Sequence, residues 1–333
     1  MEYLQLIGGF ILLIVGADIF VEGSSSIAKL LKIPAIIIGL TVVAFGTSMP
    51  EASVSINAAL VGENSIAVSN AVGSNIFNLL VVLGASALIC PVHTNDTAVK
   101  KEIPYSIISS IVLGILLCFG VSFAAEAAEA SGFFAKMSGA AYTLGRIGGV
   151  VLLLMFALYM FWQIGGALKA RRQNPEQEDE SEAKATSPMM AIEMIILGIV
   201  GIIIGGNLVV DSATVIAQNF GMSQTFIGLT IVAVGTSLPE LVTSMVAARK
   251  GESDLALGNV IGSNIFNIIF ILGFSSVLFP MTVDMHTIYD ILVLIGVSVV
   301  SWFFCKSKKK VSRVEGGIML AMYVAYFVYI LLR

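Results

Sequence analysis

Two short polar motifs interrupt the apolar sequence. GTSMPE occupies residues 46–51, and GTSLPE occupies residues 235–240. Each motif ends in a carboxylate, Glu51 or Glu240, deep inside an apolar stretch long enough to cross a bilayer. A charged carboxylate at the centre of a membrane helix costs roughly 2.5–3.5 kcal/mol, so each one needs a proton, a basic partner or a bound cation. These stretches hold no Lys or Arg at similar depth, and both histidines fall in expected loops, which leaves protons or cations.

Oxygen-bearing residues accompany each carboxylate at helical spacing. Positions i, i+3, i+4 and i+7 lie on one face of a helix. These faces carry Ala44, Thr47, Ser48 and Glu51 in the first motif, and Ala233, Thr236, Ser237 and Glu240 in the second. Pro50 and Pro239 lack an N–H and clash with the preceding turn, which predicts freed carbonyls lining a cavity. Carbonyl, hydroxyl and carboxylate oxygens form the ligand set of Ca²⁺, so the motifs predict a hard-cation site.

Amide and hydroxyl side chains follow each motif at a spacing of four residues. This spacing places them on one face of the next span, and the two sets are Asn70, Ser74 and Asn78, and Asn259, Ser263 and Asn267. Such residues also join membrane helices by hydrogen bonds, which is the alternative interpretation. Because identical sets stand beside two intramembrane carboxylates, we favour a role in lining the cation site.

The composition defines the class of protein that must position these residues. The chain has 333 residues, of which 57% are hydrophobic and 12% are charged. This is typical of an all-α polytopic membrane protein. Ten transmembrane helices are expected, at 4–24, 33–60, 66–90, 103–125, 145–168, 189–209, 225–248, 255–279, 287–305 and 315–332. Alternate loops hold 15 of the 18 Lys and Arg residues, so the positive-inside rule places both termini on the outer side.

The chain repeats itself. Residues 39–78 match residues 228–267 at 23 of 40 positions without a gap, at a constant offset of 189. We therefore expect a first five-helix repeat at 1–168, a cytoplasmic linker at 169–188 and a second five-helix repeat at 189–333. Five spans are an odd number, so the second half enters the membrane from the opposite side. Inverted-topology repeats are typical of secondary transporters, whose substrate site lies near the midplane between the halves.

With GTSxPE and GSNxFN present twice at paired positions, the chain resembles the sodium/calcium exchanger family of the calcium:cation antiporter superfamily, in its prokaryotic type without a regulatory domain. The resemblance implies exchange of cytoplasmic Ca²⁺ for external Na⁺ at one central site by alternating access. It implies Ca²⁺ binding by Thr47, Glu51, Thr236 and Glu240. For Na⁺ it implies Ala44, Ser48, Glu51, Ser74, Asn78, Ala233, Ser237, Glu240, Ser263 and Asn267. The first and sixth helices become the expected sliding gate, packed through Gly16 and Gly205.

Other functions remain open or are disfavoured. A Ca²⁺/H⁺ antiporter would use Glu51 and Glu240 as proton carriers, and another divalent cation would suit the same ligands. Asn267 stands where potassium-dependent relatives carry Asp, which argues against a K⁺ requirement. A channel would usually need several subunits around a pore. An enzyme is not expected, because the sequence lacks HExxH and the GxGD partner of an intramembrane aspartyl protease.

The expected surroundings follow from the same reasoning. We expect a multi-pass protein of the prokaryotic plasma (inner) membrane. Its partners are the lipid bilayer and inorganic cations, with no nucleic acid and no obligate protein partner. No resident cofactor is expected, since Ca²⁺ and Na⁺ are the transported ions.

Overall fold

The protein is a bundle of long helices, with some of them bent or locally widened. The computed structural model describes residues 2–123, 140–173, 187–222, 231 and 233–332. Within these residues, eight helices are long and apolar enough to cross a membrane, or nine when one bent pair is taken as a single span. The predicted seventh span, 225–248, lies partly outside the described residues.

Most helices of the first half lie where the sequence predicts them. The label η marks a π-helical segment. The elements of this half are α1 (Glu2–Leu31), α2 (Ala35–Ile38), η1 (Gly39–Val43), α3 (Ala44–Thr47), α4 (Met49–Leu60), α5 (Asn64–Phe77), η2 (Asn78–Val82), α6 (Leu83–Ile89), β1 (Val92–His93), η3 (Ala98–Glu102), α7 (Ile103–Phe119), β2 (Val121–Phe123), β3 (Ala140–Leu144) and α10 (Arg146–Gln173). The fourth predicted span, 103–125, is too long at its end, because residues 121–123 pair as a strand instead of continuing the helix.

The second half follows the same order. Its elements are α11 (Pro188–Asn219), α13 (Ala233–Thr236), α14 (Leu238–Arg249), α15 (Ser253–Ile265), η5 (Phe266–Ile271), α16 (Leu272–Leu278), β4 (Met281–Val283), α17 (Met285–Ser307), β5 (Lys310–Val311) and α18 (Arg313–Leu332). Helix α10 continues to Gln173, so it includes the first residues of the predicted linker, and residues 174–186 lie outside the described part. Arg171 and Arg172 in its last turn stabilise that extension, because cations favour the negative end of a helix.

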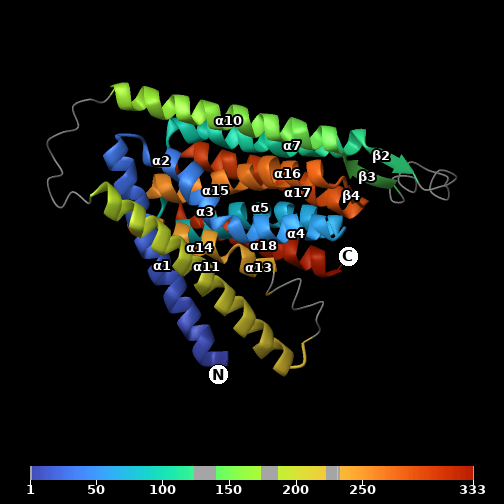
Figure 1. Ribbon diagram of the computed structural model, residues 1–333, viewed down its shortest axis with the longest axis horizontal. Helices are drawn as coiled ribbons and strands as arrows, with labels where there is room; N and C mark the ends of the chain where they lie inside the picture. Colours follow the sequence, from blue (N-terminus) through green and yellow to red (C-terminus); the bar gives the residue numbers. More distant parts are fainter. Residues whose placement is uncertain (1, 124–139, 174–186, 223–230, 232, 333) are drawn as a thin grey trace.

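Two small sheets tie the halves together at their loops. Strand β1 pairs with β5, and β2, β3 and β4 form a three-stranded antiparallel sheet at one end of the bundle (Figure 1). Beside the β1–β5 pair, hydrogen bonds from Lys309 and Lys100 lower the pKa of the Asp96 carboxyl to about 2. For the connection at 126–144, the sequence is compatible with an interfacial helix or a loop. Residues 140–144 form a strand there, while 124–139 lie outside the described residues.

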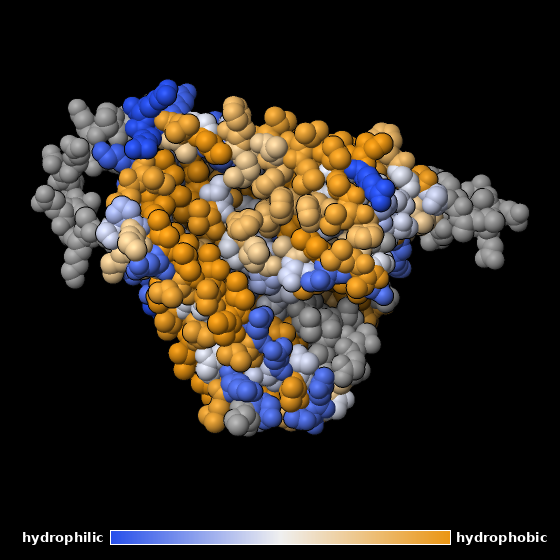
Figure 2. All heavy atoms as spheres, in the orientation of Figure 1, coloured by the Kyte–Doolittle hydropathy of each residue, from blue (hydrophilic) through white to orange (hydrophobic). Residues whose placement is uncertain are grey.

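The centre of the bundle consists of the two spans that carry the GSNIFN sequences. In the most apolar 18-residue stretch of the span Ser253–Leu278, 94% of the residues are buried, and in Ser65–Ile89 the share is 72%. The outermost spans are far more exposed, with 11% buried in Arg313–Leu332. Apolar side chains cover most of the face seen in Figure 2, and hydrophilic residues gather mainly at its margins. A lipid-facing exterior of this kind is what a membrane bundle requires.

Helices α1 and α11 form a pair that runs obliquely to the other helices (Figure 1). Their backbones touch where both lack side chains. A Cβ at Gly16 would lie 2.8 Å from the backbone nitrogen of Ile202, and one at Gly205 would lie 2.5 Å from that of Leu13. The prediction that these two glycines permit close packing is therefore confirmed.

Helix α1 is also tied to the turn between α14 and α15. Lys250, which follows α14, forms ion pairs with Asp18 at 3.0 Å and Glu22 at 3.7 Å, both on α1. Ser25 of α1 donates a hydrogen bond of 2.6 Å to Glu252. These contacts join the latter part of α1 to the turn between α14 and α15.

The glycine contact predicts different outcomes for two adjacent substitutions. Gly205→Ala places its methyl group against the backbone of α1 and is expected to destabilise the protein by about 1–3 kcal/mol. A Cβ at Gly206 would meet nothing closer than Pro239 Cγ at 3.9 Å. Gly206→Ala is therefore expected to be neutral or to stabilise by up to about 1 kcal/mol through helix propensity. Thermal unfolding in detergent measures both, and an unchanged Tm for Gly205→Ala would contradict the packing argument.

Candidate cation site

The two carboxylates sit where their spans break. The helix over residues 35–60 bends by 52° at Ser48, and α4 begins immediately after it with Pro50 in its first turn. Ser237 separates α13 from α14 in the same way. Glu51 and Glu240 therefore occupy the first turns of α4 and α14, where the positive end of the helix dipole favours an anion. Both side chains are fully buried.

Each carboxylate accepts a hydrogen bond from the opposite half of the chain. Ser237 Oγ donates to Glu51 Oε1 at 2.9 Å, and Ser48 Oγ donates to Glu240 Oε1 at 2.8 Å. Ser263 Oγ makes a longer contact with Glu240 Oε1, at 3.5 Å. These crossed bonds bring the two GTSxPE motifs together in one buried place, although the motifs are 189 residues apart in the sequence.

In each half, one asparagine joins two neighbouring spans by hydrogen bonds. Asn70 Nδ2 donates to Ser55 Oγ at 3.0 Å and to the Glu51 carbonyl at 3.4 Å. Asn259 Nδ2 makes the matching bonds, to Ser244 Oγ at 2.9 Å and to the Glu240 carbonyl at 3.4 Å. The alternative interpretation, hydrogen bonding between helices, thus applies to Asn70 and Asn259.

The Thr47 side chain and the nearby Ala44 carbonyl both form hydrogen bonds within the protein. Thr47 Oγ1 donates to Asn259 Oδ1 at 2.9 Å. The Ala44 carbonyl accepts from the Ser48 amide at 3.0 Å, so the expectation that the break frees this carbonyl is wrong. The reason is that Pro50 removes only the donor four residues after Gly46, and the Ser48 amide remains available. Thr47 Oγ1 also lies within hydrogen-bond distance of this carbonyl, at 3.4 Å.

Four buried oxygens on the carboxylates and on the adjoining π-helical segments have no hydrogen-bond partner among the described residues. They are Glu51 Oε2, Glu240 Oε2, Asn78 Oδ1 and Asn267 Oδ1. The set consists of two pairs at the repeat offset, and every member is an acceptor. A buried acceptor without a donor costs about 1–3 kcal/mol, and more when it is charged. A cation among these oxygens would remove that cost, so the arrangement fits a cation site.

The remaining predicted residues lie on the same elements. Ser74 is buried on α5, Thr236 is half-buried at the end of α13, and Ala233 starts α13. Helix α14, which carries Glu240, packs against η2, which carries Asn78, and α4 packs against η5 with Asn267. The described residues hold no cluster of three or more His, Cys, Asp and Glu side chains. The site thus has two carboxylates and many neutral oxygens.

Three π-helical segments adjoin the site, and no sequence pattern indicates them. They are η1, which ends just before Ala44, η2, which begins at Asn78, and η5, which contains Asn267. A π-helical turn widens the backbone by one residue and is frequent at functional sites. Helical spacing also fails to single out Asn75 and Asn264, although both belong to the GSNIFN sequences.

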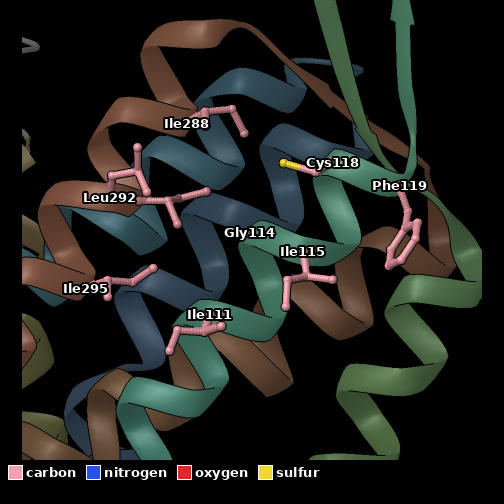
Figure 3. A pocket seen from close by; sticks show the side chains of 9 residues that line it. Ile111, Gly114, Ile115, Cys118, Phe119, Ile288, Leu292 and Ile295 are labelled. Atoms are coloured by element: carbon pink, nitrogen blue, oxygen red, sulfur yellow. The ribbon is translucent and has the colours of Figure 1, made fainter.

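A cavity of about 400 Å³ between α7 and α17 is unrelated to this site. Isoleucine, leucine and phenylalanine side chains line it together with Gly114 and Cys118 (Figure 3). An apolar lining offers no ligands to an inorganic cation, so the cavity is not a candidate for ion binding.

Comparison with known proteins places the chain among membrane transporters. The family model described as sodium/calcium exchanger protein matches residues 1–165 and 190–332. The inner membrane protein YrbG of Escherichia coli is 36% identical over 306 residues, covering 90% of this chain and 87% of YrbG. The sodium/calcium exchanger MaX1 of Methanosarcina acetivorans is 33% identical over 344 residues, covering 98% of this chain and 97% of MaX1. The structure of the sodium-calcium exchanger NCX_Mj soaked with 10 mM Na⁺ and zero Ca²⁺ has a TM-score of 0.80 and 31% identity, covering 98% of both chains.

The site predicts a loss of Ca²⁺ binding when either carboxylate becomes an amide. Removing one charge from a buried cluster costs about 3–5 kcal/mol, so Glu51→Gln and Glu240→Gln should each weaken binding by about 10²–10⁴-fold. Calorimetric titration of the purified protein in Na⁺-free buffer measures this, with size-exclusion chromatography to verify folding.

Glu102 supplies the matched control for these variants. Its carboxylate is buried elsewhere, where it accepts hydrogen bonds from Tyr159 at 3.1 Å and Gln163 at 2.8 Å. Glu102→Gln should therefore bind Ca²⁺ like the parent protein. Parent-like binding by both Glu51→Gln and Glu240→Gln would overturn the assignment of the site.

Proposed function

The chain belongs to the sodium/calcium exchanger family, and from this we propose that it moves Ca²⁺ across the membrane in exchange for Na⁺ at one central site. It is a multi-pass membrane protein and a cation antiporter by family. The proposal concerns the identity of the exchanged ions, the residues that bind them and the way access alternates.

The observation that carries the proposal is the group of four unpartnered buried oxygens, two of them from Glu51 and Glu240. Two ionised carboxylates carry a charge of about −2, and one Ca²⁺ or two Na⁺ would neutralise it. The same oxygens would serve both ions, so the ions cannot occupy the site together. Mutually exclusive occupancy couples the two fluxes, and an empty site with two unpaired carboxylates resists movement across the bilayer.

The proposed ligands are those that the resemblance implies. Ca²⁺ is bound by Thr47, Glu51, Thr236 and Glu240. Na⁺ is bound by Ala44, Ser48, Glu51, Ser74, Asn78, Ala233, Ser237, Glu240, Ser263 and Asn267. Their placement on α3, α4, α5, η2 and the matching elements of the second half supports both sets, and the two carboxylates, Asn78 and Asn267 are buried.

Alternating access is proposed to arise from ten spans arranged as two inverted five-helix repeats. Equivalent hydrogen bonds support this symmetry, because the Ser48–Glu240 and Ser237–Glu51 bonds interchange under the offset, as do the Asn70–Ser55 and Asn259–Ser244 bonds within each half. The α1–α11 pair, with glycine-lined backbone contacts and an oblique course, is the proposed moving element. Both termini are proposed to face the outside of a prokaryotic inner membrane.

Sodium is favoured over protons as the counter-ion by the neutral oxygens of the site. In proton exchange, only the two carboxylates would carry the counter-ion. The amide oxygens of Asn78 and Asn267 would then have no part in binding it, and the hydroxyls of Ser48 and Ser237 would only donate to the carboxylates. They do provide ligands for Na⁺, which binds to hard oxygen donors as Ca²⁺ does.

The proposal predicts Na⁺-driven uptake of Ca²⁺. Proteoliposomes that contain only the purified chain are loaded with Na⁺ and diluted into Na⁺-free buffer with ⁴⁵Ca²⁺, and parallel vesicles carry a pH gradient instead. Uptake is expected with the outward Na⁺ gradient and not with the pH gradient. Activity of the purified chain would also support the expectation that neither a cofactor nor a protein partner is needed.

The alternative outcomes are distinct. Uptake driven by the pH gradient alone would replace Na⁺/Ca²⁺ exchange with Ca²⁺/H⁺ antiport. Glu51→Gln should abolish uptake under either gradient, while Glu102→Gln should retain it. Uptake by Glu51→Gln vesicles equal to that of the parent would remove this site from the mechanism.

A further inference from the structure

We propose that Asn75 and Asn264 are positioning residues, which orient the side-chain amides of Asn78 and Asn267 so that their oxygens face the transported cation. This inference rests on the proposed function and deepens it, because it names residues that would not touch the ion but would set the direction of its ligands. All four side chains are buried.

Backbone carbonyls fix the orientation of the first two amides. Asn75 Nδ2 donates to the carbonyl of Asn264 at 2.9 Å, and Asn264 Nδ2 donates to the carbonyl of Asn75 at 3.3 Å. A carbonyl oxygen can only accept, so the nitrogen of each amide must face it. The amide oxygens of Asn75 and Asn264 are thereby directed elsewhere.

Those two oxygens then fix the second pair of amides. Asn75 Oδ1 accepts from Asn267 Nδ2 at 3.0 Å, and Asn264 Oδ1 accepts from Asn78 Nδ2 at 3.2 Å. A flipped Asn78 or Asn267 would place oxygen against oxygen in a buried place. The nitrogens are therefore held toward the two positioning residues, and Asn78 Oδ1 and Asn267 Oδ1 are left as buried acceptors without a partner among the described residues.

This orientation matters because an asparagine amide has two chemically opposite ends. The oxygen attracts a cation, and the NH₂ group, which is a donor only, repels it. An aspartate has oxygen at both ends and needs no such selection. Asn78 and Asn267 can thus act as ligands only when something chooses the end that faces the ion.

Each positioning residue acts across the boundary between the halves. Asn75 of α5 orients Asn267 of η5, and Asn264 of α15 orients Asn78 of η2. The four amides form one buried network on the two central spans, which pack against each other. Each half therefore sets a ligand of the other half.

A double-mutant cycle tests this role directly. Asn75→Ala alone is expected to lower Na⁺ affinity by about tenfold, since Asn267 loses the acceptor that holds its nitrogen away from the ion. In the Asn267→Asp background, the same Asn75→Ala change should not lower Na⁺ affinity, because residue 267 then has oxygen at both ends and Asn75 Oδ1 no longer opposes one of them. Displacement of bound ⁴⁵Ca²⁺ by increasing Na⁺, corrected for the Ca²⁺ affinity of each protein, measures all four proteins.

The result separates positioning from a merely structural role. An equal loss of affinity in both backgrounds, or no loss in the Asn75→Ala single variant, would overturn the proposal. Ser298→Ala is the control for a buried polar truncation, since Ser298 donates to the Leu294 carbonyl of its own helix, at 2.7 Å, and it should bind like the parent.

The equivalent double-mutant cycle in the other half and an NMR measurement on the parent protein keep the test valid if one variant misfolds. Asn264→Ala with Asn78→Asp makes the same comparison in the other half. In the unaltered protein with ¹³C-labelled asparagine side chains, Na⁺ should shift the carbonyl resonances of Asn78 and Asn267 more than those of Asn75 and Asn264. The reverse order of shifts would overturn the proposal. Absence of Ca²⁺ binding to the parent protein would instead reject the proposed function, and binding without Na⁺-driven exchange would reject only the counter-ion.

Discussion

The central constraint on this structure is that two carboxylates are buried in one place. Neither has a basic partner among the described residues. Glu51 and Glu240 have no exposed surface, and each is stabilised by a serine from the opposite half and by the first turn of its own helix. Hydrogen bonds and helix ends reduce the cost of such charges but do not neutralise them. Under the proposed function a cation completes the site, and this requirement is the proposed source of coupling between the exchanged ions.

Several local features serve that arrangement. The breaks at Ser48 and Ser237 bring the carboxylates to helix starts, and the π-helical turns at η1, η2 and η5 adjoin or contain the proposed ligand residues. The amides of the two central spans hold one another across the halves, which keeps the wall of the site in a single arrangement. The oblique α1–α11 pair lies to one side of the bundle (Figure 1), so its proposed movement would not require the amide network to break.

Much of this arrangement can be predicted from the sequence, because the strongest signals are local. Apolar length locates the spans, and the constant offset of the repeat pairs Glu51 with Glu240. The sheets cannot be predicted, since strands such as β1 and β5 are two residues long and form only by pairing with distant loops. The roles of Asn70 and Asn75 are equally hidden, because a helical face does not reveal which amide bonds to which partner. The ten-span count and the domain limits remain predictions, since part of the seventh span lies outside the described residues.

The ion pairs at one end of α1 are a difference between the two halves of a chain that contains an internal repeat. A transporter made of two interchangeable halves has two end states of equal energy, because each state is the other with the halves exchanged. Any resting preference must then come from positions where the halves differ. Lys250, bonded to Asp18 and Glu22, is such a position, since the residue 189 places earlier is Val61, whose side chain carries no charge. In the proposed exchanger, this charged contact at the rim is one of the differences that would lift the degeneracy, so the bias between the two faces would be free to change in evolution while the ion ligands stay the same.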